Sequence, residues 1–232
     1  MARIPSQEGT LAGLHYSPDQ STKEVALVCS HGFTSGKYSL DGLVSYLALK
    51  GYEGLTFDFV GHKLGGTGGE MRSMSQAVEN VHGAVDWMQK RFPEKRIVLL
   101  GHSMGAAASL AVASRDSEVA GVIALCMGTE PMLGFQGVVG RTMQAQRRDY
   151  VQGAPVEELM QGVESLLPLL GELKDTPALF VAARQDVLFS VERVSALAQL
   201  SGTNTRFETI DATHLDAPDR AKSVVLSFLT GL

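Results

Sequence analysis

Short apolar runs alternate with helically periodic segments along most of the chain. Continuous apolar runs are typical of strands buried on both faces, whereas apolar residues that repeat every three or four positions are typical of helices. Strands are predicted at residues 24–30, 54–59, 97–100, 119–126, 177–183 and 205–210. Helices are predicted at residues 39–50, 75–92, 106–113, 191–200 and 218–229. Repeated strand–helix units predict an α/β fold with a mostly parallel, doubly wound sheet and helices on both faces.

Two stretches depart from this alternation. Residues 10–16 show partial polar–apolar alternation after Gly9, which predicts an antiparallel hairpin at the sheet edge and a sheet of about eight strands. Residues 127 to about 174 follow a predicted strand without a simple crossover helix, and they show helical periodicity at 143–150 and 155–170. We expect one domain over residues 1–232 that contains an inserted helical segment, called the insertion below, at about 127–174.

Composition and charge narrow the class of protein. The chain has 232 residues, 44% of them hydrophobic, and a net charge of −5 from acidic and basic residues that occur in both halves. This balance is typical of a soluble globule and argues against a nucleic-acid partner, which needs a basic face. No apolar run reaches the length of a signal peptide or a membrane span, so we expect a cytoplasmic protein with no membrane partner. We also expect a monomer or homodimer. Cys29 and Cys126 each end an apolar run and are expected to be small buried hydrophobes.

The strongest chemical signal lies between residues 96 and 110. A predicted strand leads into Gly101-His102-Ser103-Met104-Gly105, and an alanine-rich helix follows. This is the G-x-S-x-G pattern of a nucleophile elbow, in which a tight strand-to-helix turn exposes a serine hydroxyl. Side chains on either flank of such a turn would collide, which gives Gly101 and Gly105 a steric role. Ser103 is therefore the predicted nucleophile.

Two other patterns are weaker. The glycine-rich residues 61–69 lack the Gly-Lys-Ser/Thr ending of a phosphate-binding loop. Neither cysteine has a histidine at zinc-site spacing, although Cys29 and His31 are close in sequence. We expect no metal and no cofactor.

Several motifs carry a family resemblance when they are taken together. In chain order they are Gln7-Glu8-Gly9-Thr10-Leu11, His31-Gly32-Phe33, Asp58-Phe59-Val60-Gly61-His62, the elbow, Gln185-Asp186 and Thr213-His214. The chain resembles the α/β-hydrolases over essentially its whole length, specifically the small serine esterase or lipase-like branch with a lid insertion. The order Ser, Asp, His is the order of that family. One departure is Lys63, which stands where the family usually has the second glycine of Gly-His-Gly and puts the conformation of that loop in doubt.

The resemblance implies roles for single residues. Ser103 is the nucleophile, His214 is the general base and Asp186 orients His214. The backbone N–H groups of Phe33 and Met104 form the oxyanion hole. The insertion acts as a lid over Ser103.

Other residues compete for two of these roles. The alternative acids are Asp211 and Asp216, which are nearer to His214 in sequence, and Glu130, which follows the strand that ends at Cys126. The competing histidines are His15, His31, His62, His82 and His102. His102 lies beside the nucleophile and is expected to point away from it.

The expected function is hydrolysis of carboxylic esters through an acyl-enzyme, with a small-molecule ester as the partner. The same triad also serves thioesterases, acyltransferases, amidases and carbon–carbon hydrolases, and a slowly turning over ligand receptor is the alternative outside enzymology. Apolar residues of the insertion either shape an acyl pocket or pack the lid down. Arg141, Arg147 and Arg148 either meet an acidic substrate group or form a solvated helix face, and the sequence favours the solvated face.

Overall fold

The computed structural model describes residues 1–7, 9–20, 22–173 and 175–232. Glu8, in the first motif, and Lys174, at the end of the predicted insertion, lie outside the described residues. The side chain of Arg148 lies outside them as well.

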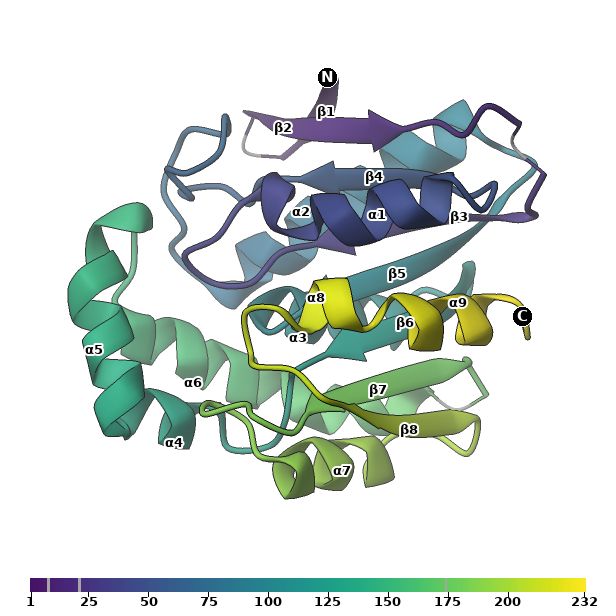
Figure 1. The fold of residues 1–232 in the computed structure, drawn as a ribbon. Coiled ribbons are helices and arrows are strands. Elements are labelled where there is room, and N and C mark those ends of the chain that lie inside the picture. The colour runs from purple at the N-terminus through teal and green to yellow at the C-terminus, as the bar shows by residue number, and fades with distance from the viewer. Residues whose placement is uncertain (8, 21, 174) are drawn as a thin grey trace.

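An eight-stranded sheet forms the centre of the structure (Figure 1). Its strands are β1 (Ala2–Ser6), β2 (Gly9–Tyr16), β3 (Val25–Ser30), β4 (Glu53–Phe57), β5 (Arg96–His102), β6 (Val119–Leu125), β7 (Ala178–Ala183) and β8 (Thr205–Ile210). They pair in the order β1-β2-β4-β3-β5-β6-β7-β8. β1 and β2 form an antiparallel hairpin, β2 is antiparallel to β4, and the other neighbours are parallel. The α/β class, the mostly parallel sheet and the edge hairpin are confirmed.

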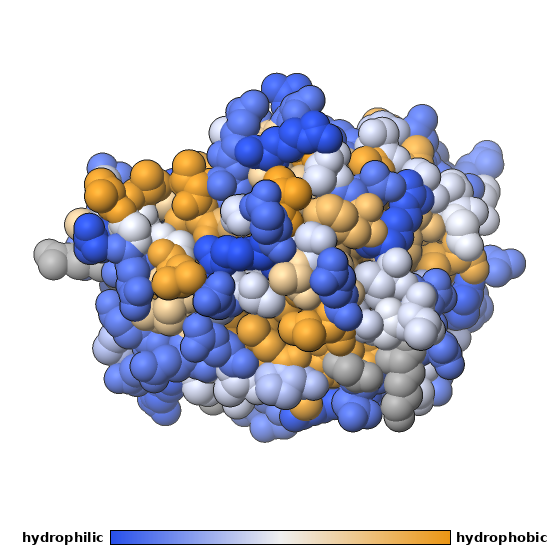
Figure 2. Space-filling view, turned by 90° about the horizontal axis from the view of Figure 1, so that it is seen from below, coloured by the Kyte–Doolittle hydropathy of each residue, from blue (hydrophilic) through white to orange (hydrophobic). Residues whose placement is uncertain are grey.

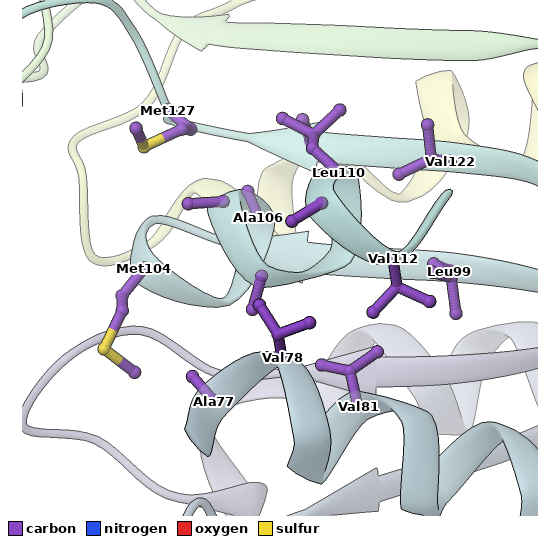
Figure 3. Close-up of a cluster of buried hydrophobic side chains, with 14 of the residues drawn as sticks. Ala77, Val78, Val81, Leu99, Met104, Ala106, Leu110, Val112, Val122 and Met127 are labelled. Atoms are coloured by element: carbon purple, nitrogen blue, oxygen red, sulfur yellow. The ribbon is translucent and has the colours of Figure 1, made fainter. Parts of the chain in front are cut away.

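Helices cover both faces of the sheet. The helices outside the insertion are α1 (Asp41–Ala48), α2 (Met74–Arg91), α3 (Met104–Ala113), α7 (Val191–Gln199), α8 (Ala217–Arg220) and α9 (Lys222–Leu229), with a short 3₁₀ turn, η1 (Lys37–Leu40), before α1. Successive strand side chains point to opposite faces, so Leu99 joins the core under α2, α3 and α7 while Val98 and Leu100 join the core under α1 and α9. In Figure 3, Val78 and Val81 of α2 point toward α3.

Between β6 and β7 the insertion is helical, as predicted. It contains α4 (Pro131–Gln136), α5 (Val138–Arg147), η2 (Arg148–Tyr150), α6 (Val156–Leu166) and η3 (Leu167–Leu173). The helix predicted at 143–150 begins earlier, at Val138, because Gly140 lies against the backbone of Gly134 and Phe135 and lets α5 pack closely on α4. α4 and α5 extend beyond the carboxyl ends of the parallel strands (Figure 1).

The two halves of the insertion are attached to the body differently. α6 buries Leu159, Met160 and Val163, whereas α5 buries only Gly140 among its described side-chain positions. Backbone bonds join residues 150–154 to the loop after β4, including Gln152 N–H to the Gly61 carbonyl at 2.9 Å. Leu133, Val138 and Val139 are exposed, and Figure 2 shows hydrophobic patches on the side of the molecule where α4 and α5 lie.

A buried ion pair connects the loops that follow β3 and β4. Lys37 Nζ lies 2.6 Å from Asp58 Oδ2, and the two side chains are 2% and 0% exposed. Asp58 also accepts hydrogen bonds from the backbone N–H groups of Lys37 and Gly66, both at 2.7 Å. A Cβ on Gly65 would overlap this carboxylate, so the glycine-rich loop packs directly onto it. The pair therefore fixes the loop after β3, which contains Gly32 and Phe33, relative to the loop after β4.

Replacement of Asp58 by asparagine is expected to destabilise the fold strongly. The variant D58N leaves the Lys37 ammonium buried without a counter-charge, which costs about 3–5 kcal/mol. Urea denaturation monitored by circular dichroism measures the change in the free energy of unfolding. The control is E208Q, which removes an exposed pair with Arg206 and costs about 1 kcal/mol or less. Equal losses in the two variants would contradict the stabilising role of the buried pair.

Candidate active site

Ser103 occupies a strained turn between β5 and α3. Its backbone has φ 53° and ψ −119°, a combination that side-chain-bearing residues rarely adopt. A Cβ on Gly101 would overlap the backbone of Ala106, and one on Gly105 would overlap the carbonyls of Ser30 and His31. The steric interpretation of the two flanking glycines is confirmed. At these two glycines the backbone of α3 approaches β5 and the end of β3 directly.

His214 and Asp186 form a hydrogen-bonded pair at the carboxyl ends of the last two strands. Asp186 follows β7 and His214 follows β8, and His214 Nδ1 lies 2.8 Å from Asp186 Oδ2. The other oxygen, Asp186 Oδ1, accepts from the backbone N–H groups of Leu188 at 2.8 Å and Phe189 at 3.0 Å. Burial alone would raise the pKa of Asp186. The hydrogen bond and the charge of His214, together with the hydrogen bonds from the two backbone N–H groups, outweigh burial and lower the pKa below its usual value. The carboxylate is held ionised against one nitrogen of the ring.

The alternative acids do not reach His214. Asp216 accepts from the Thr213 N–H at 2.6 Å and stabilises the turn that leads into α8. Asp211 forms an exposed pair with Arg184 at 3.5 Å. Glu130, in the left-handed region at φ 53°, precedes α4, and its carbonyl accepts from Arg193.

Three of the other histidines have local structural partners. His15 lies 2.8 Å from Glu53. His31 donates from Nδ1 to the Gly32 carbonyl at 2.8 Å and accepts at Nε2 from the Phe59 N–H at 3.1 Å, and burial lowers its pKa to about 4. His62 donates from Nδ1 to the Val60 carbonyl at 3.2 Å, and burial lowers its pKa to about 3. His82 lies within α2.

His102 links the elbow to the loop that contains His214. Its Nε2 donates to the backbone carbonyl of His214 at 2.8 Å, and the two rings are 4.8 Å apart. Burial, followed by the nearby His214, lowers the pKa of His102 to about 3, so its ring is neutral. The sequence analysis does not predict this contact. Residues 102 and 214 are far apart in the chain, and no local pattern relates them.

Gly32, Phe33, Ser103 and His214 line one cavity, together with residues of α4 and α5. The cavity is partly open to solvent. A Cβ on Gly32 would lie 3.3 Å from Ser103 Cβ, which shows how closely the loop after β3 approaches the elbow. Ser103 and His214 line the cavity together but form no hydrogen bond with each other.

Two backbone N–H groups beside Ser103 have no hydrogen-bond acceptor in the described part of the chain. They belong to Phe33, in the loop after β3, and to Met104, the first residue of α3. The first N–H groups of a helix have no acceptor within the helix and bear a partial positive charge. These are the two N–H groups that the sequence analysis assigns to an oxyanion hole, and that assignment stays a prediction.

His102, Cys126 and His214 have ligand atoms within 4.8 Å of one another, a grouping typical of a metal site. The hydrogen bonds to the His214 carbonyl and to Asp186 occupy one nitrogen of each ring, His102 Nε2 and His214 Nδ1. A metal also binds the thiolate, and burial raises the pKa of the Cys126 thiol well above its usual value, with Asp186 adding to the effect. The raised pKa keeps the Cys126 thiol protonated and opposes metal binding here. Both cysteines are buried, as predicted.

Within the described ranges, no helix has the length and apolar character of a membrane span.

Solved structures with the same fold cover nearly the whole chain. The Pyrococcus furiosus esterase Pf2001 superposes with a TM-score of 0.78 at 21% identity, covering 99% of this chain and 91% of that one. The esterase domain of a Rhodothermus marinus protein gives 0.73 at 18% identity, with coverages of 98% and 95%. The enol-lactonase from Burkholderia xenovorans LB400 gives 0.71 at 19% identity, with coverages of 99% and 100%. At these identities the likeness establishes the fold.

Sequence comparison identifies the family. No curated protein matches the chain. Residues 21–148, more than half of the chain and including the loop after β3 and the elbow, match the family described as serine aminopeptidase, S33. The chain therefore belongs to the serine aminopeptidase S33 family and is an α/β-hydrolase.

Proposed function

We propose that the protein is a serine hydrolase that cleaves carboxylic esters through an acyl-enzyme. One observation chiefly supports this function. Ser103, at the strained elbow, lines the same cavity as His214, and the Nδ1 atom of His214 lies 2.8 Å from the buried carboxylate of Asp186. A serine hydroxyl is a weak nucleophile until a neighbouring base removes its proton. The arrangement provides a serine, a base and a carboxylate in one place.

The proposed reaction begins when Ser103 Oγ attacks the ester carbonyl and His214 Nε2 accepts the hydroxyl proton. Asp186 keeps the proton on Nδ1 and stabilises the imidazolium, which then protonates the departing alcohol. Water, activated by the same histidine, releases the acid from Ser103. The hydrogen bond between Ser103 and His214 forms on substrate binding, since catalytic hydrogen bonds are often long before the substrate arrives.

Negative charge develops on the carbonyl oxygen during both steps. The unoccupied N–H groups of Phe33 and Met104 are proposed to bind that oxygen, and each such donor contributes about 10²–10³ in rate. Gly32 lets the first of them approach Ser103 closely. The buried Lys37–Asp58 pair holds this loop in position before the substrate binds.

The insertion is proposed to act as the lid of this site. Phe135 of α4 and Met143 of α5 line the cavity, opposite Leu188 and Leu215 of the loops that present the acid and the base. These side chains give an apolar wall that suits a medium acyl chain or an aromatic acid. The position of α4 and α5 beyond the strand ends supports the lid interpretation (Figure 1).

Replacement of Ser103 by alanine is expected to abolish turnover. In S103A, kcat/KM for p-nitrophenyl butyrate falls by about 10³–10⁶-fold because the acyl-enzyme cannot form. The matched control is S114A at the end of α3, whose hydroxyl donates to the Ala111 carbonyl. Wild-type protein should complete many turnovers per molecule, which a slow-turnover receptor would not. Similar rates in S103A and S114A would contradict the assignment of the nucleophile.

Activity is expected to fall as the pH is lowered from 8 to 5. Protonation of His214 removes the lone pair that accepts the serine proton. Because the pKa of Asp186 lies below its usual value, this carboxylate stays ionised over the same range and remains an acceptor for His214.

The variant D186N tests this assignment. Its kcat/KM falls by about 10²–10⁴-fold because the imidazolium has lost its carboxylate. D211N, which alters an exposed aspartate, is the control and should keep the wild-type profile. A flat wild-type profile, or the same kcat/KM in D186N and D211N, would overturn the proposed base and acid.

A further inference from the structure

The cavity that contains Ser103 has an uneven distribution of charge. Its described lining includes no aspartate or glutamate, and its one permanently charged side chain is Arg147. Apolar side chains, among them Phe33, Phe135 and Met143, form much of the remaining wall. A single guanidinium in a partly enclosed apolar cavity is screened less than a surface charge. The cavity therefore favours a ligand with a negative charge.

Helix α5 directs Arg147 into this cavity. Gly140, Met143, Gln144 and Arg147 recur at the spacing of one helix face, and this face is buried or half-buried. Met143, Gln144 and Arg147 all line the cavity. Arg141, on the same helix, does not line it and is exposed. The two arginines differ in their surroundings although they share one helix.

The guanidinium of Arg147 has no hydrogen bond or ion pair within the described part of the chain. Arg141, by contrast, donates to the Gln136 carbonyl. Arg193 is bound to the carbonyls of Thr129 and Leu188 at 2.7–2.9 Å. An arginine at the last turn of a helix can bond the free carbonyls there, and Arg147 does not do so. Its donors remain available to a ligand.

We propose that Arg147 is an anion-recognition residue, so that the esters cleaved at Ser103 bear a carboxylate away from the scissile bond. This inference rests on the proposed ester hydrolysis. A guanidinium matches a carboxylate with two parallel N–H donors, and the Gln144 side chain lies on the same helix face. The expectation of a solvated helix face for this arginine is replaced by a role in substrate selection.

Two pairs of esters test the proposal on either side of the scissile bond. The first pair tests the acyl side: ethyl hydrogen glutarate carries a carboxylate where ethyl 4-carbamoylbutanoate carries an amide. The second pair tests the alcohol side: 4-acetoxybutanoate carries a carboxylate where 4-acetoxybutanamide carries an amide. The ratio of kcat/KM for acid over amide is measured by titrating released acid. In at least one pair we expect this ratio to fall about tenfold or more from wild type to R147Q, because a charged hydrogen bond is lost.

Matched variants separate charge from packing. R141Q removes the same charge from the same helix outside the cavity and should keep the wild-type ratio. R147K keeps the positive charge but lacks the planar guanidinium with its paired N–H donors. It should retain part of the preference for the carboxylate over the amide. A ratio that is unchanged in R147Q for both pairs, or that falls equally in R141Q, overturns the proposal.

A binding measurement distinguishes failure of this inference from failure of the proposed function. Calorimetric titration of ethyl hydrogen glutarate and 4-acetoxybutanoate into S103A and into S103A/R147Q needs no turnover. If the esters are hydrolysed without a preference for the carboxylate over the amide, the proposed ester hydrolysis is supported and the role of Arg147 is overturned. Binding that depends on Arg147 without hydrolysis keeps the anion site and overturns the ester chemistry. Absence of both hydrolysis and binding overturns both.

Discussion

The close approach of α3 to β5 is the constraint on which the site depends. Ser103 keeps its strained backbone because α3 begins directly after it and packs against the sheet through positions where only glycine fits. The same packing leaves the Met104 N–H, at the start of the helix, without an acceptor beside the serine hydroxyl. One steric requirement at Gly101 and Gly105 thus accounts for both the position of Ser103 at the cavity and the N–H group proposed to bind the oxyanion.

The parallel sheet brings the remaining groups to this point. Parallel strands have their carboxyl ends at one edge, and the loops after β3, β5, β7 and β8 present Phe33, Ser103, Asp186 and His214 there. The hydrogen bond from His102 to the His214 carbonyl joins two of these loops directly. A neutral His102 suits this position, because a second cation beside His214 would oppose the imidazolium of the proposed reaction.

Local signals explain how much of this could be predicted from sequence. The apolar runs predict the central strands because strands covered on both faces need apolar residues throughout, and the glycine pattern predicts the elbow because the steric requirement is local. The choice of Asp186 over Asp211 and Asp216 came from the family resemblance, since proximity in sequence favours the other two. The Lys37–Asp58 pair and the contact between His102 and His214 join residues far apart in the chain, and no local pattern indicates them. The start of α5 was misplaced because Gly137 and Gly140 resemble helix breakers, whereas Gly140 serves the contact with α4.

The attachment of the insertion explains how substrate selection can be separated from chemistry. Residues 150–154 are bonded to the loop after β4, and that loop is bonded through Asp58 to the loop that contains Phe33. The base of the insertion is therefore fixed to the same framework as the proposed oxyanion hole. α5 itself buries little, and it contributes Met143, Gln144 and Arg147 to the cavity from one face. Substitutions on that face are expected to change what the cavity accepts and to leave Ser103, His214 and Asp186 in place, because the Asp186–His214 hydrogen bond and the glycine contacts of the elbow involve no residue of α5.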